Sequence, residues 1–244
     1  MARQTLALSR HIRNCLMYLD ERSQRAFLKK FRQQSGDSRQ FGHTNIELIV
    51  GVFGAMAGLI PQYEPKMEGQ KPDWRFFDLS GKPLFFADVV NFHMNQAIEK
   101  KMDEAEQAQR MISSWGPEEL PDSRDRLLPS LKEKAAKYKA LADRTGLGFV
   151  IFLYGWFEAF LHPMAVESCL RNRKFGLFKD YPHLRGVFHF DNALPVGRGR
   201  EPPGYRFRYY GNSDPSRPLL SLVDGIVPLP IPEPPTRSKG TPRA

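Results

Sequence analysis

Hydrophobic and polar residues alternate along the chain with two different periods, and each period predicts a different element. Apolar residues recur every three to four positions over residues 5–34, which predicts one or two helices there. Residues 35–38 break this pattern. A new helix is predicted to begin at Thr44 or Asn45, because Glu47 stands three residues after Thr44 and completes a capping box.

Strand-like patterns follow in the middle of the chain. Residues 74–79 and 83–92 flank Ser80-Gly81 and predict a hairpin with a two-residue loop. The continuous apolar run 149–154 predicts a strand that is buried on both faces. The other predicted elements are a charged helix over 93–111, a loop over 115–129, helices over 131–142 and 164–171, a strand over 186–190 and an edge strand over 205–210. This alternation of helices and strands indicates an α/β protein.

Three acidic residues stand where an apolar residue is expected. Asp88 lies inside an otherwise apolar strand, Asp73 opens the preceding strand, and Glu47 lies at the start of an apolar helix. The predicted two-residue loop places Asp73 opposite Asp88, and like charges in that position destabilise a sheet. A divalent cation resolves the conflict, and oxygen ligands favour Mg²⁺ or Mn²⁺ over softer metals.

Several segments stand in a defined order around these acidic residues. They are Glu47 on a helix, Lys71-Pro72-Asp73-Trp74, Phe85-Phe86-Ala87-Asp88-Val89-Val90, and a later helix with Lys134 and Tyr138 that precedes an apolar strand. This order resembles the PD-(D/E)XK superfamily of nucleases over roughly residues 44–191. The resemblance implies a restriction-endonuclease-like core, in which helices flank a mixed central β-sheet. In that core a helix precedes a three-stranded meander, a second helix follows, and another strand joins the sheet.

The resemblance also implies a role for each acidic residue. Asp73 and Asp88 would bind Mg²⁺ or Mn²⁺, with the carbonyl of Val89 as a third ligand. Glu47 would orient a metal-bound water or the metal itself. The implied reaction is metal-assisted hydrolysis of phosphodiester bonds in DNA.

The chain departs from the superfamily at the lysine of the motif. That lysine should stand two residues after Asp88, where this chain has Val90. Some members carry the working lysine on a neighbouring helix, and Lys134 and Lys137 are the candidates here. The spacing of Lys134 and Tyr138 also resembles the Gln-x-x-x-Tyr helix of RecB-like nucleases. The alternative interpretation is a solvent-facing lysine surface on this helix, with Tyr138 packed on the core.

Positive charge is concentrated at the two ends of the chain. The 244 residues include 36 Lys and Arg and 27 Asp and Glu, which gives a net charge of +9. Residues 1–45 carry +6 and residues 192–244 carry +4, whereas the region between them carries −1. Basic ends favour contact with a polyanion, most simply nucleic acid, although they also serve solubility. The candidate nucleic-acid-binding residues, interleaved with Tyr and Phe, are Arg198, Arg200, Arg206 and Arg208. The alternative for this segment is an exposed edge hairpin.

Other classes of site find little support in the sequence. Two cysteines, Cys15 and Cys169, cannot form a disulfide framework or a four-thiolate zinc site. No histidine pair has the spacing of a zinc motif; the five considered are His43, His93, His162, His183 and His189. The chain shows no signal-peptide core and no apolar run long enough for a membrane span, so we expect a cytoplasmic protein that does not enter membranes.

These observations predict three regions: a basic helical appendage over 1–43, a nuclease core over 44–191, and a basic, proline-rich and partly disordered extension over 192–244. The leading hypothesis is a metal-dependent DNA nuclease. The first alternative is a degenerate relative that binds nucleic acid or a protein partner without cleavage, which Val90 favours. A third is an interaction protein in which Asp73 caps a turn and Asp88 pairs with a lysine. A homodimer or a complex with another protein stays open.

Overall fold

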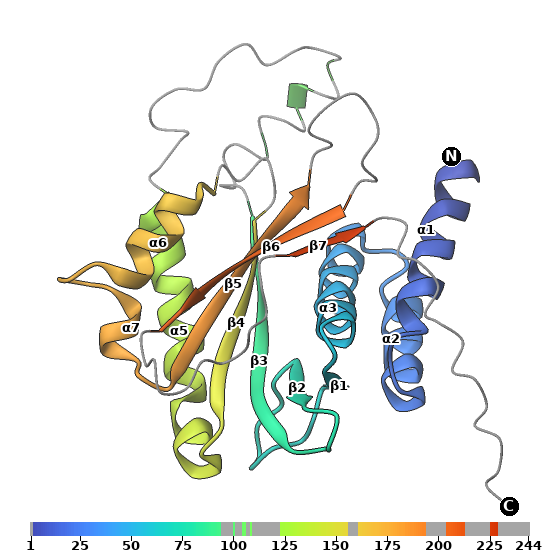
Figure 1. The fold of residues 1–244 in the computed structure, drawn as a ribbon. Coiled ribbons are helices and arrows are strands. Elements are labelled where there is room, and N and C mark those ends of the chain that lie inside the picture. The colour runs from blue at the N-terminus through green and yellow to red at the C-terminus, as the bar shows by residue number, and fades with distance from the viewer. Residues whose placement is uncertain are drawn as a thin grey trace, which may run out of the picture.

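A computed structural model shows one β-sheet between two layers of helices (Figure 1). The structure describes residues 2–93, 123–155, 161–193, 204–212 and 225–228, together with positions 100, 104, 105 and 108. Most of the predicted charged helix and loop over 93–122, and the predicted disorder after Pro228, lie outside the described residues.

Within the described residues the sheet has seven strands, which lie side by side in their chain order. Their bounds are β1 (Ile60–Tyr63), β2 (Trp74–Phe77), β3 (Pro83–Phe92), β4 (Gly148–Gly155), β5 (Leu184–Ala193), β6 (Gly204–Gly211) and β7 (Gly225–Pro228). β3, β4 and β5 run parallel, and every other neighbouring pair is antiparallel. This mixed sheet with helices on both faces confirms the predicted α/β class.

Three helices cover one face of the sheet: α1 (Ala2–Leu16), α2 (Glu21–Gln33) and α3 (Ser38–Met56). Residues 5–34 therefore contain two helices, which confirms the prediction of one or two helices in this region. The predicted start of the next helix at Thr44 is wrong. Asp37 caps α3 by accepting from the backbone N–H of Gln40 at 3.0 Å. Thr44 lies inside the helix, where its hydroxyl donates to Gln34 at 2.5 Å.

The other face is covered by α5 (Ser123–Thr145), α6 (Pro163–Arg171) and α7 (Leu177–Asp180). The predicted loop over 115–129 is wrong for residues 123–129, which belong to α5. Pro129 lies inside this helix, although a proline costs it one backbone hydrogen bond. Leu127 and Leu131, four residues apart on one helical face, are both fully buried. Their packing against the sheet therefore outweighs the helix-breaking signal.

The predicted pairing of the hairpin strands is confirmed, but the predicted loop is wrong. Trp74 faces Ala87 across the β2–β3 ladder, so Asp73 and Asp88 occupy the next facing positions. The strands end at Phe77 and resume at Pro83, after a register shift that the pattern did not reveal. The longer loop is closed by hydrogen bonds around Asp78, whose carboxylate accepts from the backbone of Ser80 and Lys82 at 2.9 Å each.

The sheet extends further at both ends than the sequence suggested. β1 was not predicted because it is short and contains Pro61, which an edge strand tolerates. The prediction that 205–210 is an edge strand is wrong, because β7 pairs with β6 from Gly204 to Phe207. Thus two strands within the predicted C-terminal extension continue the sheet of the predicted core.

No helix in the described part of the chain is both long enough and apolar enough to cross a membrane.

Candidate functional site

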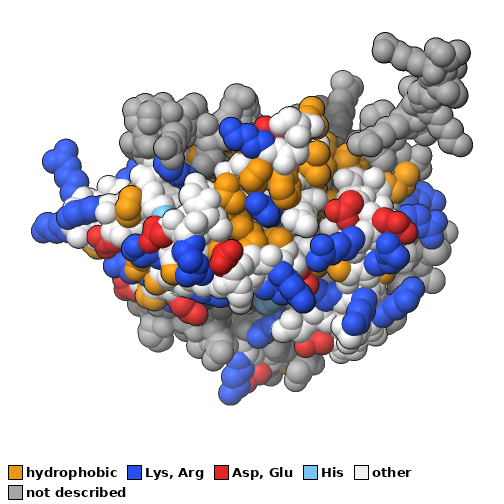
Figure 2. All heavy atoms as spheres, turned by 90° about the horizontal axis from the view of Figure 1, so that it is seen from below, with side chains coloured by type: hydrophobic (Ala, Val, Ile, Leu, Met, Phe, Trp, Pro, Cys, Tyr) orange, Lys and Arg blue, Asp and Glu red, His pale blue; other side chains and the backbone are white. Residues whose placement is uncertain are grey.

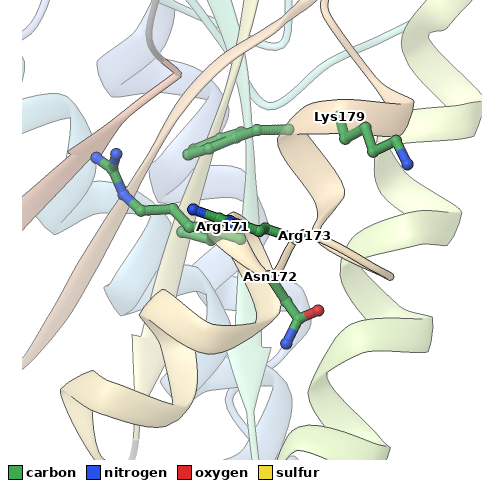
Figure 3. A pocket seen from close by; sticks show the side chains of 6 residues that line it. Arg171, Asn172, Arg173 and Lys179 are labelled. Atoms are coloured by element: carbon green, nitrogen blue, oxygen red, sulfur yellow. The ribbon is translucent and has the colours of Figure 1, made fainter.

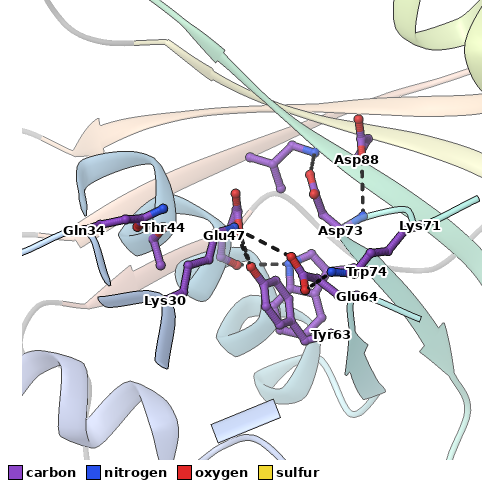
Figure 4. Close-up of polar contacts among 11 residues, drawn as sticks. Lys30, Gln34, Thr44, Glu47, Tyr63, Glu64, Lys71, Asp73, Trp74 and Asp88 are labelled. Carbon is purple, nitrogen blue, oxygen red and sulfur yellow. Dashed lines mark hydrogen bonds and ion pairs between the residues drawn. The ribbon is translucent and has the colours of Figure 1, made fainter. Parts of the chain in front are cut away.

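Asp73 and Asp88 lie in direct contact at the β2–β3 ladder (Figure 4). The backbone N–H of Asp73 donates to Oδ1 of Asp88 at 3.3 Å, and Oδ2 of Asp73 accepts from the backbone N–H of Val89 at 2.7 Å. Asp88 is buried, with 2% of its surface exposed, whereas Asp73 is half-buried. The structure therefore joins the two predicted aspartates. Val89 reaches Asp73 through its amide, and its carbonyl as a metal ligand stays a prediction.

Helix α5 supplies two further groups to Asp88. Nζ of Lys134 lies 2.6 Å from Oδ2 of Asp88, and the hydroxyl of Tyr138 donates to Oδ1 at 3.0 Å. The two residues are one helical turn apart, so both point toward β3. Lys137 is exposed, with its ammonium 4.7 Å from the centre of the Tyr138 ring. Of the two candidate lysines, the structure therefore brings Lys134 to the aspartates.

The position of Val90 explains why a lysine can reach this site from a helix. Val90 is buried, on the same face of β3 as Asp88, in the core that α5 covers. A valine in this position lets α5 pack closely against the strand. Lys134 then approaches Asp88 from the helix that faces it, with 30% of its side chain exposed.

Burial and like charge together determine the protonation of the pair. The pKa of Asp73 is raised well above its ordinary value, first by desolvation and then by the negative charges of Asp88 and Glu47. Burial lowers the pKa of Lys134, but attraction to Asp88 and Asp73 outweighs this effect, so the pKa ends above its ordinary value. Burial and like charge thus favour the protonated form of Asp73, which lies beside the Asp88–Lys134 ion pair.

Glu47 lies next to the aspartates but is held by a different set of residues. Its Oε2 accepts from Nζ of Lys30 at 2.7 Å and from the hydroxyl of Tyr63 at 2.5 Å. Its backbone carbonyl accepts from the indole N–H of Trp74 at 3.0 Å. A Cβ on Gly51 would lie 2.2 Å from the Trp74 ring, so the glycine permits this close packing of α3 on β2.

The segment between β1 and β2 completes this surrounding network. The backbone N–H of Glu64 donates to the carbonyl of Asp73 at 2.8 Å, and Glu64 has a φ of 44°, in the left-handed region. Its carboxylate lies 3.8 Å from Lys30 and pairs with Lys71. Because Lys30 belongs to α2, the predicted N-terminal appendage contributes directly to the surroundings of the site. Lys30 and Tyr63 were not singled out from the sequence.

Two of the four predicted nucleic-acid-binding arginines lie among the described residues. Arg198 and Arg200 lie outside the described residues. Arg206 is exposed and forms an ion pair with Asp191 at 2.9 Å, while Arg208 faces His189 across the β5–β6 ladder. Figure 2 shows Lys and Arg side chains around a group of hydrophobic side chains on the lower face of the molecule, spread out rather than gathered in one patch.

A basic pocket of about 280 Å³ lies between α6 and α7 (Figure 3). Its lining consists of Leu170, Arg171, Asn172, Arg173, Phe178 and Lys179. The side chains of Arg171 and Lys179 point in opposite directions. These two cations therefore do not converge on one small anion.

The donor set at the aspartates fits one hard cation with a partly aqueous shell. Among the described residues, no group of three or more His, Cys, Asp and Glu side chains could hold a metal ion. Mg²⁺ commonly needs only one or two protein carboxylates, because waters and substrate phosphates complete its shell. Asp73 and Asp88 offer two carboxyl groups at neighbouring positions of the ladder, and their binding of a metal stays a prediction.

Comparisons of the chain with known protein families, with curated proteins and with solved structures found no match.

Proposed function

We propose that the protein is a divalent-metal-dependent nuclease that hydrolyses phosphodiester bonds in DNA. The observation that carries this proposal is the convergence of Lys134 and Tyr138 on Asp88, which itself touches Asp73. Two carboxyl groups and a lysine around one point are the elements of metal-assisted phosphodiester hydrolysis. The lysine that is missing at position 90 is thereby replaced from α5.

The order of the elements supports a restriction-endonuclease-like core. Helix α3 precedes the antiparallel meander β1–β3, α5 follows on the opposite face, and β4 then joins the sheet parallel to β3. This is the arrangement that the resemblance to the PD-(D/E)XK superfamily implies. The proposal rests on this order together with the four residues of the site.

Each residue of the site has a separate task in the proposed reaction. Asp73 and Asp88 would hold Mg²⁺ or Mn²⁺, which supplies an activated water and screens the charge of the phosphate. Asp73, with its raised pKa, would release its proton when the cation binds. Lys134 uses one of its three N–H donors on Asp88 and has others for a phosphate oxygen. Tyr138 fixes the orientation of Asp88.

A cleavage assay with a matched lysine control tests this function. Plasmid and linear DNA are incubated with Mg²⁺ or Mn²⁺ and the wild-type protein, Asp88→Asn, Lys134→Ala or Lys137→Ala. We expect cleavage by the wild type and Lys137→Ala, and its loss in Asp88→Asn and Lys134→Ala. The proposal is contradicted if Asp88→Asn cleaves DNA as fast as the wild type does, or if the wild type does not cleave DNA.

A second candidate is a nucleic-acid-binding protein that does not cleave. Three hydrogen bonds already engage both oxygens of Asp88, and the Asp88–Lys134 pair is also what a purely structural role predicts. The basic pocket between α6 and α7 offers contacts that need no metal. Salt-sensitive retention of DNA without cleavage in the same assay supports this candidate, and absence of both retention and cleavage rules out both functions.

A further inference from the structure

His43 and His93 meet in the structure although they are 50 positions apart in the chain. Their Nε2 atoms lie 2.6 Å apart, and their rings are stacked with centroids 4.7 Å apart and planes at 29°. His43 belongs to the first half of α3, and His93 directly follows β3. Both are half-buried.

Two features hold the imidazoles in this position. His43 is fixed within α3, and the guanidinium of Arg126 on α5 donates to the backbone carbonyl of His93. The same guanidinium lies 4.8 Å from the centre of the Phe92 ring. One helical layer carries His43, and the other fixes the backbone of His93. Such positioning is part of the pre-organisation that a ligand site requires.

We propose that His43 and His93 form a binding site for a transition-metal cation that prefers imidazole, such as Zn²⁺, Co²⁺ or Ni²⁺. Neutral imidazole is the common protein ligand for these ions, whereas Mg²⁺ prefers carboxylate oxygen. This site is distinct from the aspartate pair and does not rest on the proposed nuclease function. Water or an external group would complete the coordination.

The present contact needs only a small change to accept a metal. Two neutral rings at this distance share one N–H···N hydrogen bond, so one Nε2 carries a hydrogen. Moving this hydrogen to Nδ1 frees both Nε2 lone pairs without net proton release. Metal–nitrogen bonds of about 2.0–2.1 Å at a tetrahedral angle place the two nitrogens roughly 3.3 Å apart, so the rings must separate by roughly 0.7 Å.

Charges of both signs surround His43. Burial of the imidazole lowers its pKa. The charges felt by His43 are mixed: Glu47 and Asp37 favour a cation, and Arg39 and Lys30 oppose it. Asn91 stands near the end of β3, two residues before His93, and its Oδ1 has no hydrogen-bond partner in the described structure.

Metal titration in excess Mg²⁺ tests the proposal, since Mg²⁺ occupies carboxylate sites and competes poorly for imidazole. Zn²⁺ binding is followed by calorimetry and Co²⁺ binding by visible absorption, without DNA. We expect one site in the wild-type protein. His43→Phe, which keeps an aromatic ring but no donor, and His93→Gln should each bind at least about tenfold more weakly, because even indirect partners of metal ligands contribute that much.

Two controls make the outcome decisive. His162→Asn removes an exposed histidine while keeping a residue that can cap α6, so its metal affinity should equal that of the wild type. His43→Cys supplies a thiolate donor and should bind Zn²⁺ where His43→Phe does not. Thermal melting shows which variants are folded. The proposal is overturned if the wild type binds no Zn²⁺ in excess Mg²⁺, or if folded His43→Phe and His93→Gln bind as tightly as the wild type.

Discussion

Two pairs of acidic residues lie close together in this protein, and they differ in the number of lysines that accompany them (Figure 4). Glu47 and Glu64 are matched by Lys30 and Lys71, which gives two cations for two carboxylates. Asp73 and Asp88 are matched only by Lys134 among the described residues. The first pair is balanced, and the second lacks one positive charge.

This difference separates a structural cluster from a candidate reaction site. The glutamates are partly exposed and tie α2, α3 and the β1–β2 segment together. The aspartates are more deeply enclosed, and burial together with the charge of Asp88 raises the pKa of Asp73, which favours a proton there. Because a proton can be exchanged for a metal ion, the incomplete pair is the one at which we propose that a cation binds.

The largest expected effect is on cleavage when Asp88 loses its charge. Asp88→Asn keeps the size of the side chain but removes the charge that pairs with Lys134 and that would bind the proposed metal. In the nuclease assay we expect the rate to fall at least about 100-fold, comparable to the loss of one well-placed stabilising group in an enzyme site. The matched Glu64→Gln change in the balanced pair should leave the rate within a factor of about two. A similar loss in both variants would contradict the contrast between the pairs.

Removal of Lys134 should leave the Asp73–Asp88 pair without a cation. The free energy of unfolding should then depend on Mg²⁺. Lys134→Met leaves Asp88 buried without its cation, which for a buried ion pair costs about 3–5 kcal/mol of unfolding free energy. Because 30% of the lysine side chain is exposed, we expect the lower end of this range. Mg²⁺ should restore part of the loss. Urea unfolding with and without Mg²⁺ measures both effects.

Lys30→Met in the balanced pair is the control for this experiment. It should cost less, because Tyr63 still donates to Glu47 and Lys71 still pairs with Glu64, and its stability should not respond to Mg²⁺. If Mg²⁺ raises the free energy of unfolding of both variants equally, the cation does not act at the Asp73–Asp88 pair.

The sequence predicted the aspartate site better than its surroundings. Asp73 and Asp88 could be paired because both lie on one short hairpin, where strand pairing follows from residue numbers over a few positions. Lys134 and Tyr138 could be proposed because their spacing resembles the Gln-x-x-x-Tyr helix of RecB-like nucleases. The actual loop was not predictable, since the register shift at Phe76 and Phe77 leaves no mark in the pattern. The fold class followed from the alternation of elements.

Contacts between distant segments could not be predicted in the same way. The Phe27 ring stacks on Tyr63 with centroids 3.9 Å apart, which docks α2 beside the site. The apolar stripe of α2 predicted a helix, but it did not predict the surface that this helix covers. Lys30 was therefore assigned to a basic N-terminal appendage. His43 and His93 were missed for the same reason: metal motifs were sought at short spacing, whereas these rings meet through the packing of α3 beside the end of β3.

The protonation of Asp73 predicts a defined dependence of stability on pH. In the unfolded chain Asp73 ionises near its ordinary pKa of about 3.9, but in the folded protein it stays protonated to higher pH. The folded state therefore binds more protons above about pH 4, and Asp73 destabilises the fold increasingly as pH rises toward its folded pKa. Asp73→Asn removes this effect, so the stability of the variant relative to the wild type should rise as the pH increases from about 4 to 7.

Urea unfolding of the wild type and Asp73→Asn at several pH values checks this slope. Asp143→Asn is the control, because the pKa of the exposed Asp143 is lowered by Lys139 and shifts in the opposite direction. A stability difference between Asp73→Asn and the wild type that does not change with pH would show that Asp73 is ionised in the folded protein.

The smallest expected effect belongs to the outer lysine of the balanced pair. Lys71 is 54% exposed at its side chain, and Glu64 keeps Lys30 at 3.8 Å when Lys71 is removed. Lys71→Ala should therefore lower the free energy of unfolding by no more than about 0.5 kcal/mol, as for other exposed ion pairs. Added salt should reduce this difference further. Urea unfolding at low and high salt measures it. If Lys71→Ala lowers the free energy of unfolding as much as Lys134→Met does, the glutamates also need both of their lysines. The distinction between a balanced and an incomplete pair would then be wrong.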